Sequence, residues 1–121
     1  MTEGERTRRA VLGDAHVDRS LSNATDFDRP FQDFATTAAW GAVWSDDTLT
    51  RRERSLVTLA ILAATGCLEE FALHVRAAAN TGATPEEVMQ VILHAGAYAG
   101  VPRANAATRV ARETLTEMGA I

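Results

Sequence analysis

Apolar residues recur at three- and four-residue intervals along most of the chain, and no stretch of useful length alternates apolar and polar positions. The first spacing is typical of helices and the second of strands, so the pattern predicts an all-α protein. We expect one domain, residues 1–121, folded as a compact bundle of about six helices. Residues 15–27 lack a clean period and are expected to form mostly an ordered connection. The expected helices cover residues 5–14, 29–44, 51–65, 68–81, 85–99 and 103–118.

Two of these helices carry further signals. Thr84 and Glu87 have the spacing of a capping box, in which each side chain binds the backbone N–H of the other residue. The run from Leu56 to Ala64 is apolar on nearly all sides of its helix. A helix without a polar face is buried, so helix 51–65 is expected at the centre of the fold.

The composition disfavours several kinds of partner and cellular location. The formal net charge is −4, which disfavours nucleic acid and anionic membrane as partners. The longest apolar run, Leu56 to Ala64, is too short to span a bilayer, and the N-terminus has no apolar core of a signal peptide. Cys67 is the only cysteine, so no intramolecular disulfide can form. We expect a cytoplasmic protein.

Glu70 and His74 are the strongest candidates for chemistry. They are four residues apart, so they project from one face of one helix. A carboxylate beside an imidazole can orient it and favour its protonated form, which makes a general acid–base unit. An ordinary surface ion pair is the alternative. Apolar neighbours, Phe71 and Val75 among them, favour the first interpretation.

Further candidates surround this pair in the sequence. His94 and Tyr98 form a second pair four residues apart, which could donate hydrogen bonds or simply pack against a neighbouring helix. Trp44 follows Trp40 by one turn, as a stacked core or as a wall for a flat ring. All twelve basic residues are arginines, whose planar forks suit carboxylates. Arginines at four positions could bind a substrate carboxylate: Arg29, Arg51, Arg52 and Arg54.

Other site types lack their motifs. The three histidines are far apart, with neither H-x-x-x-H nor H-E-x-x-H spacing, so we expect no metal site. The chain also contains no G-x-G-x-x-G, no phosphate-binding Walker loop and no G-x-S-x-G. This disfavours nucleotide and serine-hydrolase chemistry.

Several stretches resemble one known family in that family's order. The strings RRAVLGDAHVDRSL, AWGAVW, RRERSLVTLAILAA and HAGAYAGVPRAN look like the γ-carboxymuconolactone decarboxylase (4-carboxymuconolactone decarboxylase) family. The wider alkylhydroperoxidase-like superfamily includes peroxidases with C-x-x-C-x-x-x-H and an upstream glutamate. Here Glu70 stands at the second cysteine position and Ser55 at the upstream acid, nineteen residues before His74. These departures disfavour disulfide chemistry and favour the decarboxylases.

The resemblance implies an all-α homohexamer, for which a trimer of dimers is one arrangement, with no cofactor. It implies conversion of 4-carboxymuconolactone to 3-oxoadipate enol-lactone in protocatechuate breakdown by the β-ketoadipate pathway. The substrate is therefore a small lactone carboxylate. For this reaction we expect His74 to act as general acid or oxyanion donor, with Glu70 orienting it. The remaining roles are a second donor (Tyr98 or His94), a cation for the acetate arm (Arg54 or Arg29) and an apolar wall (Trp44 or Phe31).

Three other functions stay open from the sequence. The fold could host another cofactor-free decarboxylation, isomerisation or cyclisation in natural-product biosynthesis. Cys67, at a helix start, could serve a thiol peroxidase or redox protein. A helical assembly module without catalysis would leave Glu70 and His74 as surface residues.

Overall fold

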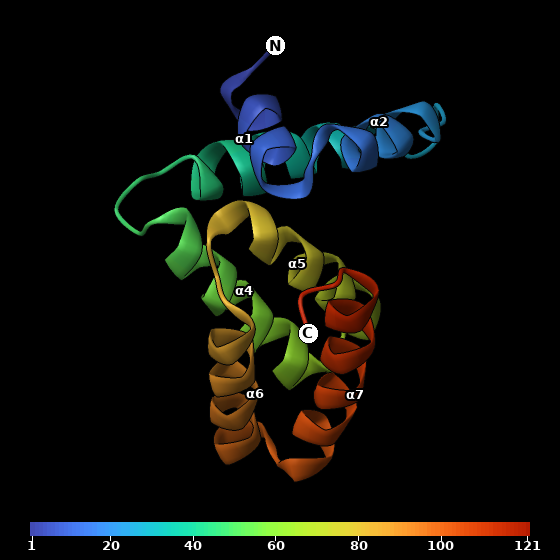
Figure 1. Cartoon of the computed structure of the whole chain (residues 1–121). Helices are drawn as coiled ribbons and strands as arrows, with labels where there is room; N and C mark the ends of the chain where they lie inside the picture. The colour runs from blue at the N-terminus through green and yellow to red at the C-terminus, as the bar shows by residue number, and fades with distance from the viewer. The chain divides into compact units, whose positions relative to one another are not determined.

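The computed structural model describes all 121 residues and contains helices and no strands, which confirms the all-α prediction (Figure 1). None of the helices is long and apolar enough to cross a membrane. The chain divides into two compact units, Met1–Arg51 and Arg52–Ile121. The first contains α1 (Glu3–Leu12), α2 (Asp14–Ser22), α3 (Arg29–Phe34) and the π-helix η1 (Ala35–Trp44). The second contains α4 (Arg51–Thr65, which starts one residue before the boundary), α5 (Leu68–Thr81), α6 (Pro85–Ala99) and α7 (Val101–Glu117).

Helix α2 corrects the sequence prediction. Residues 15–27 were expected to be mostly a connection, but the chain is helical through Ser22. Gly13, with φ of 89°, separates α1 from α2 and lies in a region that favours glycine. Val17 is the one buried residue of α2, so the helix has no apolar stripe that a periodicity search could detect. Since α3 and η1 together cover the helix predicted over residues 29–44, the fold has one helix more than expected.

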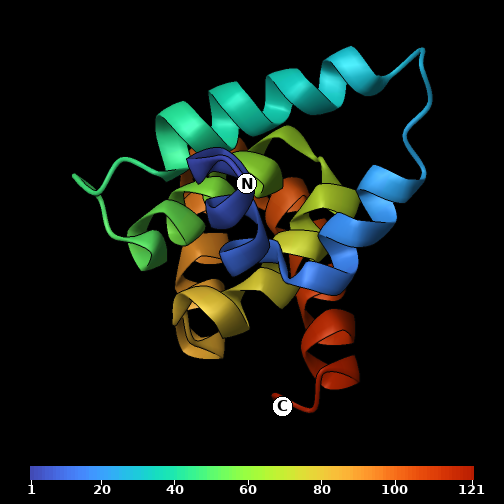
Figure 2. The ribbon, with the colours of Figure 1, turned by 90° about the horizontal axis from the view of Figure 1, so that it is seen from above.

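The first unit is held by a close approach between α1 and the helix that follows α2. Figure 2 shows α3 and η1 as one continuous helix, and α1 packs mainly on its η1 part. Gly4 on α1 is buried against the backbone of this helix. A Cβ atom built at Gly4 would lie 3.0 Å from the backbone nitrogen of Gly41 and would clash with the carbonyl oxygen of Thr36. Only glycine fits at position 4.

Gly4→Ala is expected to lower the free energy of unfolding by about 1–3 kcal/mol, the usual cost of inserting a methyl group into a filled space. The clash is with backbone atoms, so no side chain can turn away to relieve it. Urea unfolding followed by circular dichroism measures the loss. The exposed neighbour Glu3 provides the control Glu3→Ala. Equal stabilities of the two variants would contradict the close packing.

The second unit is built around one apolar cluster, and α7 packs on both α5 and α6. Helices α4 and α5 have the bounds that the sequence predicts. The capping box of α6 is also confirmed, since the Thr84 hydroxyl accepts from the Glu87 N–H at 3.2 Å. The Glu87 carboxylate in turn accepts from the Thr84 N–H at 2.9 Å. The buried core residues are Leu59, Ala63, Phe71, Val75, Val88, Ile92, Ala95, Ala107, Ala111 and Leu115.

Helix α4 is less buried than its sequence predicts. Only Ser55, Leu59 and Ala63, on one stripe, are buried. Val57 and Ile61 on another stripe are 50% and 56% exposed. The apolar run was expected to place this helix at the centre of the fold. Instead, one face of α4 is buried in the core and another apolar face is exposed at the surface.

Candidate active site

The buried face of α5 carries the leading candidate. Phe71 and Val75 are both 0% exposed, and they fix this face of the helix in the core of the second unit. His74 lies between them in the sequence and is 7% exposed, whereas Glu70, one turn earlier, is exposed. A buried imidazole is not part of an ordinary surface ion pair. His74 is therefore sheltered from solvent, and the Glu70 carboxylate lies one turn away at the surface.

Helix α4 brings two polar residues of its first turns into or near the interior. Arg54 is half-buried, and Ser55 is 0% exposed. The Ser55 hydroxyl oxygen is buried and has no hydrogen-bond partner. A buried polar atom without a partner costs free energy, so the Ser55 hydroxyl is unusual in this core. The sequence predicted no role for Ser55, which was noted only because it stands at the position of the peroxidases' upstream acid.

His94 and Tyr98 lie together on α6, but away from His74. Their rings stack with centroids 5.2 Å apart and planes at 24°. Both are exposed, Tyr98 to 85%, so they do not pack under a neighbouring helix of this chain. They line the α4–α6 groove, which we define as two adjoining hollows that share Ala60 and His94.

The α4–α6 groove is largely apolar. Its two hollows have volumes of about 500 and 470 Å³. Neither Glu70 nor His74 lines it, so the structure brings together the pair His94–Tyr98 but does not join it to the α5 pair in one pocket. The lining residues are Leu56, Val57, Ala60, Ile61, Ala64, Glu87, Gln90, Val91, His94, Ala95, Tyr98 and Ala99.

Three expected binding residues lie in the first unit. Trp44 is 8% exposed and stacks on Trp40 with centroids 5.1 Å apart, as their spacing predicts. Phe31 is 65% exposed and forms no part of a buried wall. The side chain of Arg29 is also largely exposed, and its guanidinium lies 4.0 Å from the carboxylate of Asp26. Of these three, only Trp44 is sheltered.

Cys67 is exposed at the N-terminal end of α5, where the Thr65 hydroxyl lies 3.3 Å from its sulfur. It is the only cysteine of the chain, so no second thiol can resolve an oxidised sulfur within one copy. No group of three or more His, Cys, Asp or Glu side chains is arranged to hold a metal ion.

Sequence reasoning missed one buried cation, Arg8 on α1. A signal was present in the sequence, because Gly4, Thr7, Arg8 and Val11 follow helical spacing on one stripe of α1. All four residues are buried. An arginine on a buried stripe deserves the same attention as a histidine on one.

The fold and site define a class: a small all-helical protein with a buried histidine, a glutamate one turn away and an apolar surface groove. The model of the family described as "Carboxymuconolactone decarboxylase family" matches residues 29–113. The chain belongs to this family.

Relatives support the same assignment. The chain is 46% identical over 117 residues to a 4-carboxymuconolactone decarboxylase of Acinetobacter baylyi, covering 97% of this chain and 87% of that protein. It is 40% identical over 116 residues to the nitrosuccinic acid decarboxylase npaB of Metarhizium robertsii, covering 96% and 81%. A 4-carboxymuconolactone decarboxylase of Pseudomonas putida is 55% identical over 38 residues, which is 31% of this chain and 79% of that sequence.

Proposed function

We propose that this protein is a carboxy-lyase that converts 4-carboxymuconolactone to 3-oxoadipate enol-lactone. The observation that carries this proposal is the 46% identity, over nearly the whole chain, to a protein named for that activity. The buried His74 supports it, because decarboxylation of this lactone needs a group that stabilises an oxyanion and supplies a proton.

The substrate supplies its own electron sink. The bond between the ring and the leaving carboxylate breaks, and its electron pair moves through the ring double bond into the lactone carbonyl as CO2 departs. The resulting dienolate then takes a proton at the carbon next to that carbonyl. The protein must therefore bind two carboxylates, stabilise one developing oxyanion and deliver one proton. None of these tasks requires a cofactor.

We assign these tasks to the residues that the sequence singled out. His74 donates to the developing oxyanion or delivers the proton, and Glu70 at the surface end of the same helix face orients it. Tyr98 or His94 of another copy supplies a second donor, since these residues share no hollow with His74 within one chain. Arg54, which is half-buried on α4 in the same unit, binds the acetate arm.

A second candidate substrate is favoured by the 40% identity to a nitrosuccinic acid decarboxylase. In nitrosuccinate the nitro group can accept the electron pair as a nitronate, so the same protein groups could serve. Steady-state release of CO2 from each compound by the purified protein separates the two. We expect kcat/KM to be higher for 4-carboxymuconolactone. A higher value for nitrosuccinate would replace the first proposal with the second, and no turnover of either would overturn both.

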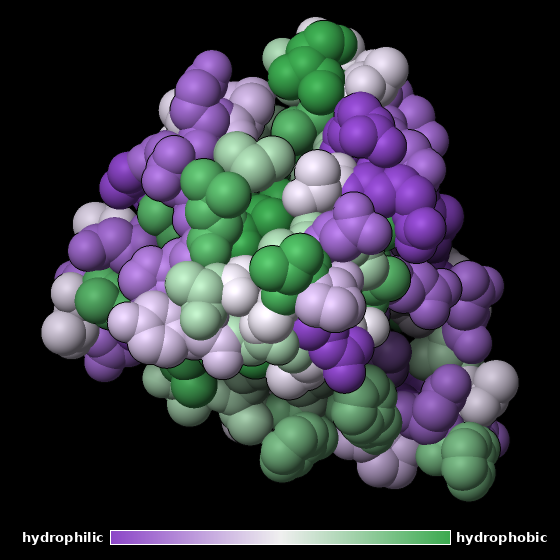
Figure 3. Space-filling model, turned by 90° about the horizontal axis from the view of Figure 1, so that it is seen from below, coloured by the Kyte–Doolittle hydropathy of each residue, from purple (hydrophilic) through white to green (hydrophobic).

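We further propose that the protein works as a homohexamer and that the α4–α6 groove is a contact between copies. Val57 and Ile61 are about half exposed, and Tyr98 is 85% exposed. Figure 3 shows patches of apolar residues at the surface of one face, interspersed with polar ones. Single chains rarely leave large apolar patches uncovered. A second copy would explain why α4 is apolar on a face that this chain does not bury.

Ile61→Arg is expected to convert the wild-type hexamer into a smaller species, because an arginine in a buried apolar contact has no anionic partner. Size-exclusion chromatography with light scattering measures the mass. Ala79 is exposed on α5, so Ala79→Arg provides a control that keeps the wild-type mass. A monomeric wild type would contradict the assembly, and an unchanged Ile61→Arg mass would contradict this contact.

A further inference from the structure

The first unit contains a small hollow, of about 240 Å³, that the proposed reaction leaves unassigned. All of its lining residues come from α1 with the residue that precedes it, from α2 and from the long helix formed by α3 and η1. Those that matter here are Glu5, Arg8, Val17, Leu21, Asp33 and Thr36.

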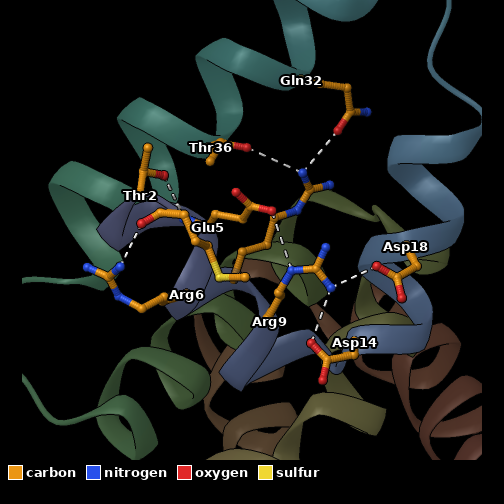
Figure 4. Close-up of polar contacts among 10 residues, drawn as sticks. Thr2, Glu5, Arg6, Arg9, Asp14, Asp18, Gln32 and Thr36 are labelled. Carbon is orange, nitrogen blue, oxygen red and sulfur yellow. Dashed lines mark hydrogen bonds and ion pairs between the residues drawn. The ribbon is translucent and has the colours of Figure 1, made fainter.

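Arg8 is a buried cation whose hydrogen-bonding capacity is only partly used. It is 7% exposed. One guanidinium nitrogen, Nη1, donates to Oε1 of Gln32 at 3.0 Å and to the hydroxyl of Thr36 at 3.4 Å (Figure 4). Both acceptors are neutral, and the Nε atom of Arg8 is buried without a hydrogen-bond partner. Burial lowers the pKa of Arg8, and repulsion by Arg9 lowers it further, although Glu5 opposes the change.

Carboxylates on α1 and α2 form ion pairs with Arg9 instead of Arg8. Glu5 lies 3.5 Å from Nε of Arg9, and Arg9 also binds Asp14 and Asp18 at 3.2 and 2.8 Å (Figure 4). These two carboxylates raise the pKa of Arg9. Neither carboxylate that lines the hollow, Glu5 or Asp33, forms an ion pair with Arg8.

Of the two carboxylates that line the hollow, Glu5 therefore pairs with Arg9. The exposed Asp33 lines the same hollow as the buried Arg8 without pairing with it. A buried arginine without a carboxylate is costly, and a ligand carboxylate would use the second terminal nitrogen, Nη2, which neither Gln32 nor Thr36 occupies. A purely anionic ligand would be repelled by Asp33. A ligand that also carries an ammonium group would instead be attracted by it.

We propose that this hollow binds the zwitterion of a small α-amino acid, with its carboxylate on Arg8 and its ammonium group toward Asp33. The Thr36 hydroxyl provides a further polar contact, and Leu21 provides an apolar wall for a short aliphatic side chain. This site goes beyond the proposed decarboxylation and does not depend on it.

Titration of the isotope-labelled full-length protein with L-valine, followed by amide NMR shifts, tests the site. Saturable shifts are expected at residues that line the hollow, within 2–37. Two analogues remove one charge each: 3-methylbutanoate lacks the ammonium group and isobutylamine lacks the carboxylate. Each is expected to bind about tenfold more weakly or worse, since hydrogen bonds between charged groups are the strong ones. No shift with valine, or equal binding of 3-methylbutanoate, would overturn the proposal.

Two variants assign the roles, and the exposed Asp33 allows a substitution that does not disturb the interior. Arg8→Gln and Asp33→Asn are both expected to weaken valine binding about tenfold or more. Arg19→Gln and Asp47→Asn change exposed charges outside the hollow and should bind valine as the wild type does. Wild-type affinity in folded Asp33→Asn would refute the zwitterion site even if Arg8→Gln fails to fold.

Discussion

Replacing His74 with glutamine is expected to lower kcat/KM for decarboxylation by about 10²–10⁴-fold, the usual contribution of a positioned acid or base. Glutamine keeps a hydrogen-bond donor and a similar volume but cannot carry the proton. The imidazole is 7% exposed, so its surroundings strengthen its electrostatic effect on a bound anion. Steady-state release of CO2 from 4-carboxymuconolactone measures the change.

The control for His74→Gln lies on the same helix. Glu69 is exposed in the first turn of α5, so Glu69→Gln alters the local charge without touching the buried face. Circular dichroism and the melting temperature establish that both variants fold. Wild-type turnover in a folded His74→Gln protein would remove His74 from the reaction and favour an assembly role for this helix.

Phe71→Ala is expected to cause the largest loss of stability, about 3–5 kcal/mol, since it removes a large side chain from a filled core. Phe71 is 0% exposed and is the largest of the fully buried side chains. A loss of that size is a large part of the 5–15 kcal/mol that typically separates folded from unfolded protein. Urea unfolding at one fixed protein concentration measures it, because subunit association also stabilises the fold.

Phe27 offers a matched control for this measurement. It is 93% exposed, so Phe27→Ala removes the same atoms without opening a cavity, and a change within about 0.5 kcal/mol is expected. Equal losses from the two substitutions would mean that α5 is not anchored through Phe71, which would also remove the support for the position of His74.

The helix bounds of the second unit could be predicted from the sequence because they depend on contacts between residues close together in the chain. Thr84 and Glu87 fix the start of α6 through contacts within four residues, and α5 carries a clear apolar stripe through Phe71 and Val75. The first unit gave weaker signals. Helix α2 has the single buried residue Val17, and a stripe of one residue has no period.

The site was less predictable, since burial depends on contacts between segments distant in the sequence, which the spacing of residues does not show. Spacing placed Glu70 and His74 on one face of α5, but only the structure distinguishes the buried imidazole from the exposed carboxylate. The apolar run of α4 was expected to be buried within the chain, yet Val57 and Ile61 reach the surface. Apolar composition shows that a face must be covered, not which molecule covers it.

Arg8 illustrates the opposite difficulty. Its neighbours Gly4 and Val11 show that the stripe is buried, but the two acceptors of Arg8, Gln32 and Thr36, lie more than twenty residues away. Hydrogen bonds between helices that are distant in sequence leave no periodic trace. Buried polar groups of this kind are found by inspecting the structure.

The carbon at which the product takes up a proton from solvent tests the proposed reaction most directly. We propose a single turnover of 4-carboxymuconolactone in D2O, with chelator-treated protein and NMR detection of the product. We expect CO2 release and 3-oxoadipate enol-lactone that carries one deuterium at the ring carbon next to the lactone carbonyl. Absence of CO2 release, or an enol-lactone without deuterium at that carbon, would contradict decarboxylation through the dienolate.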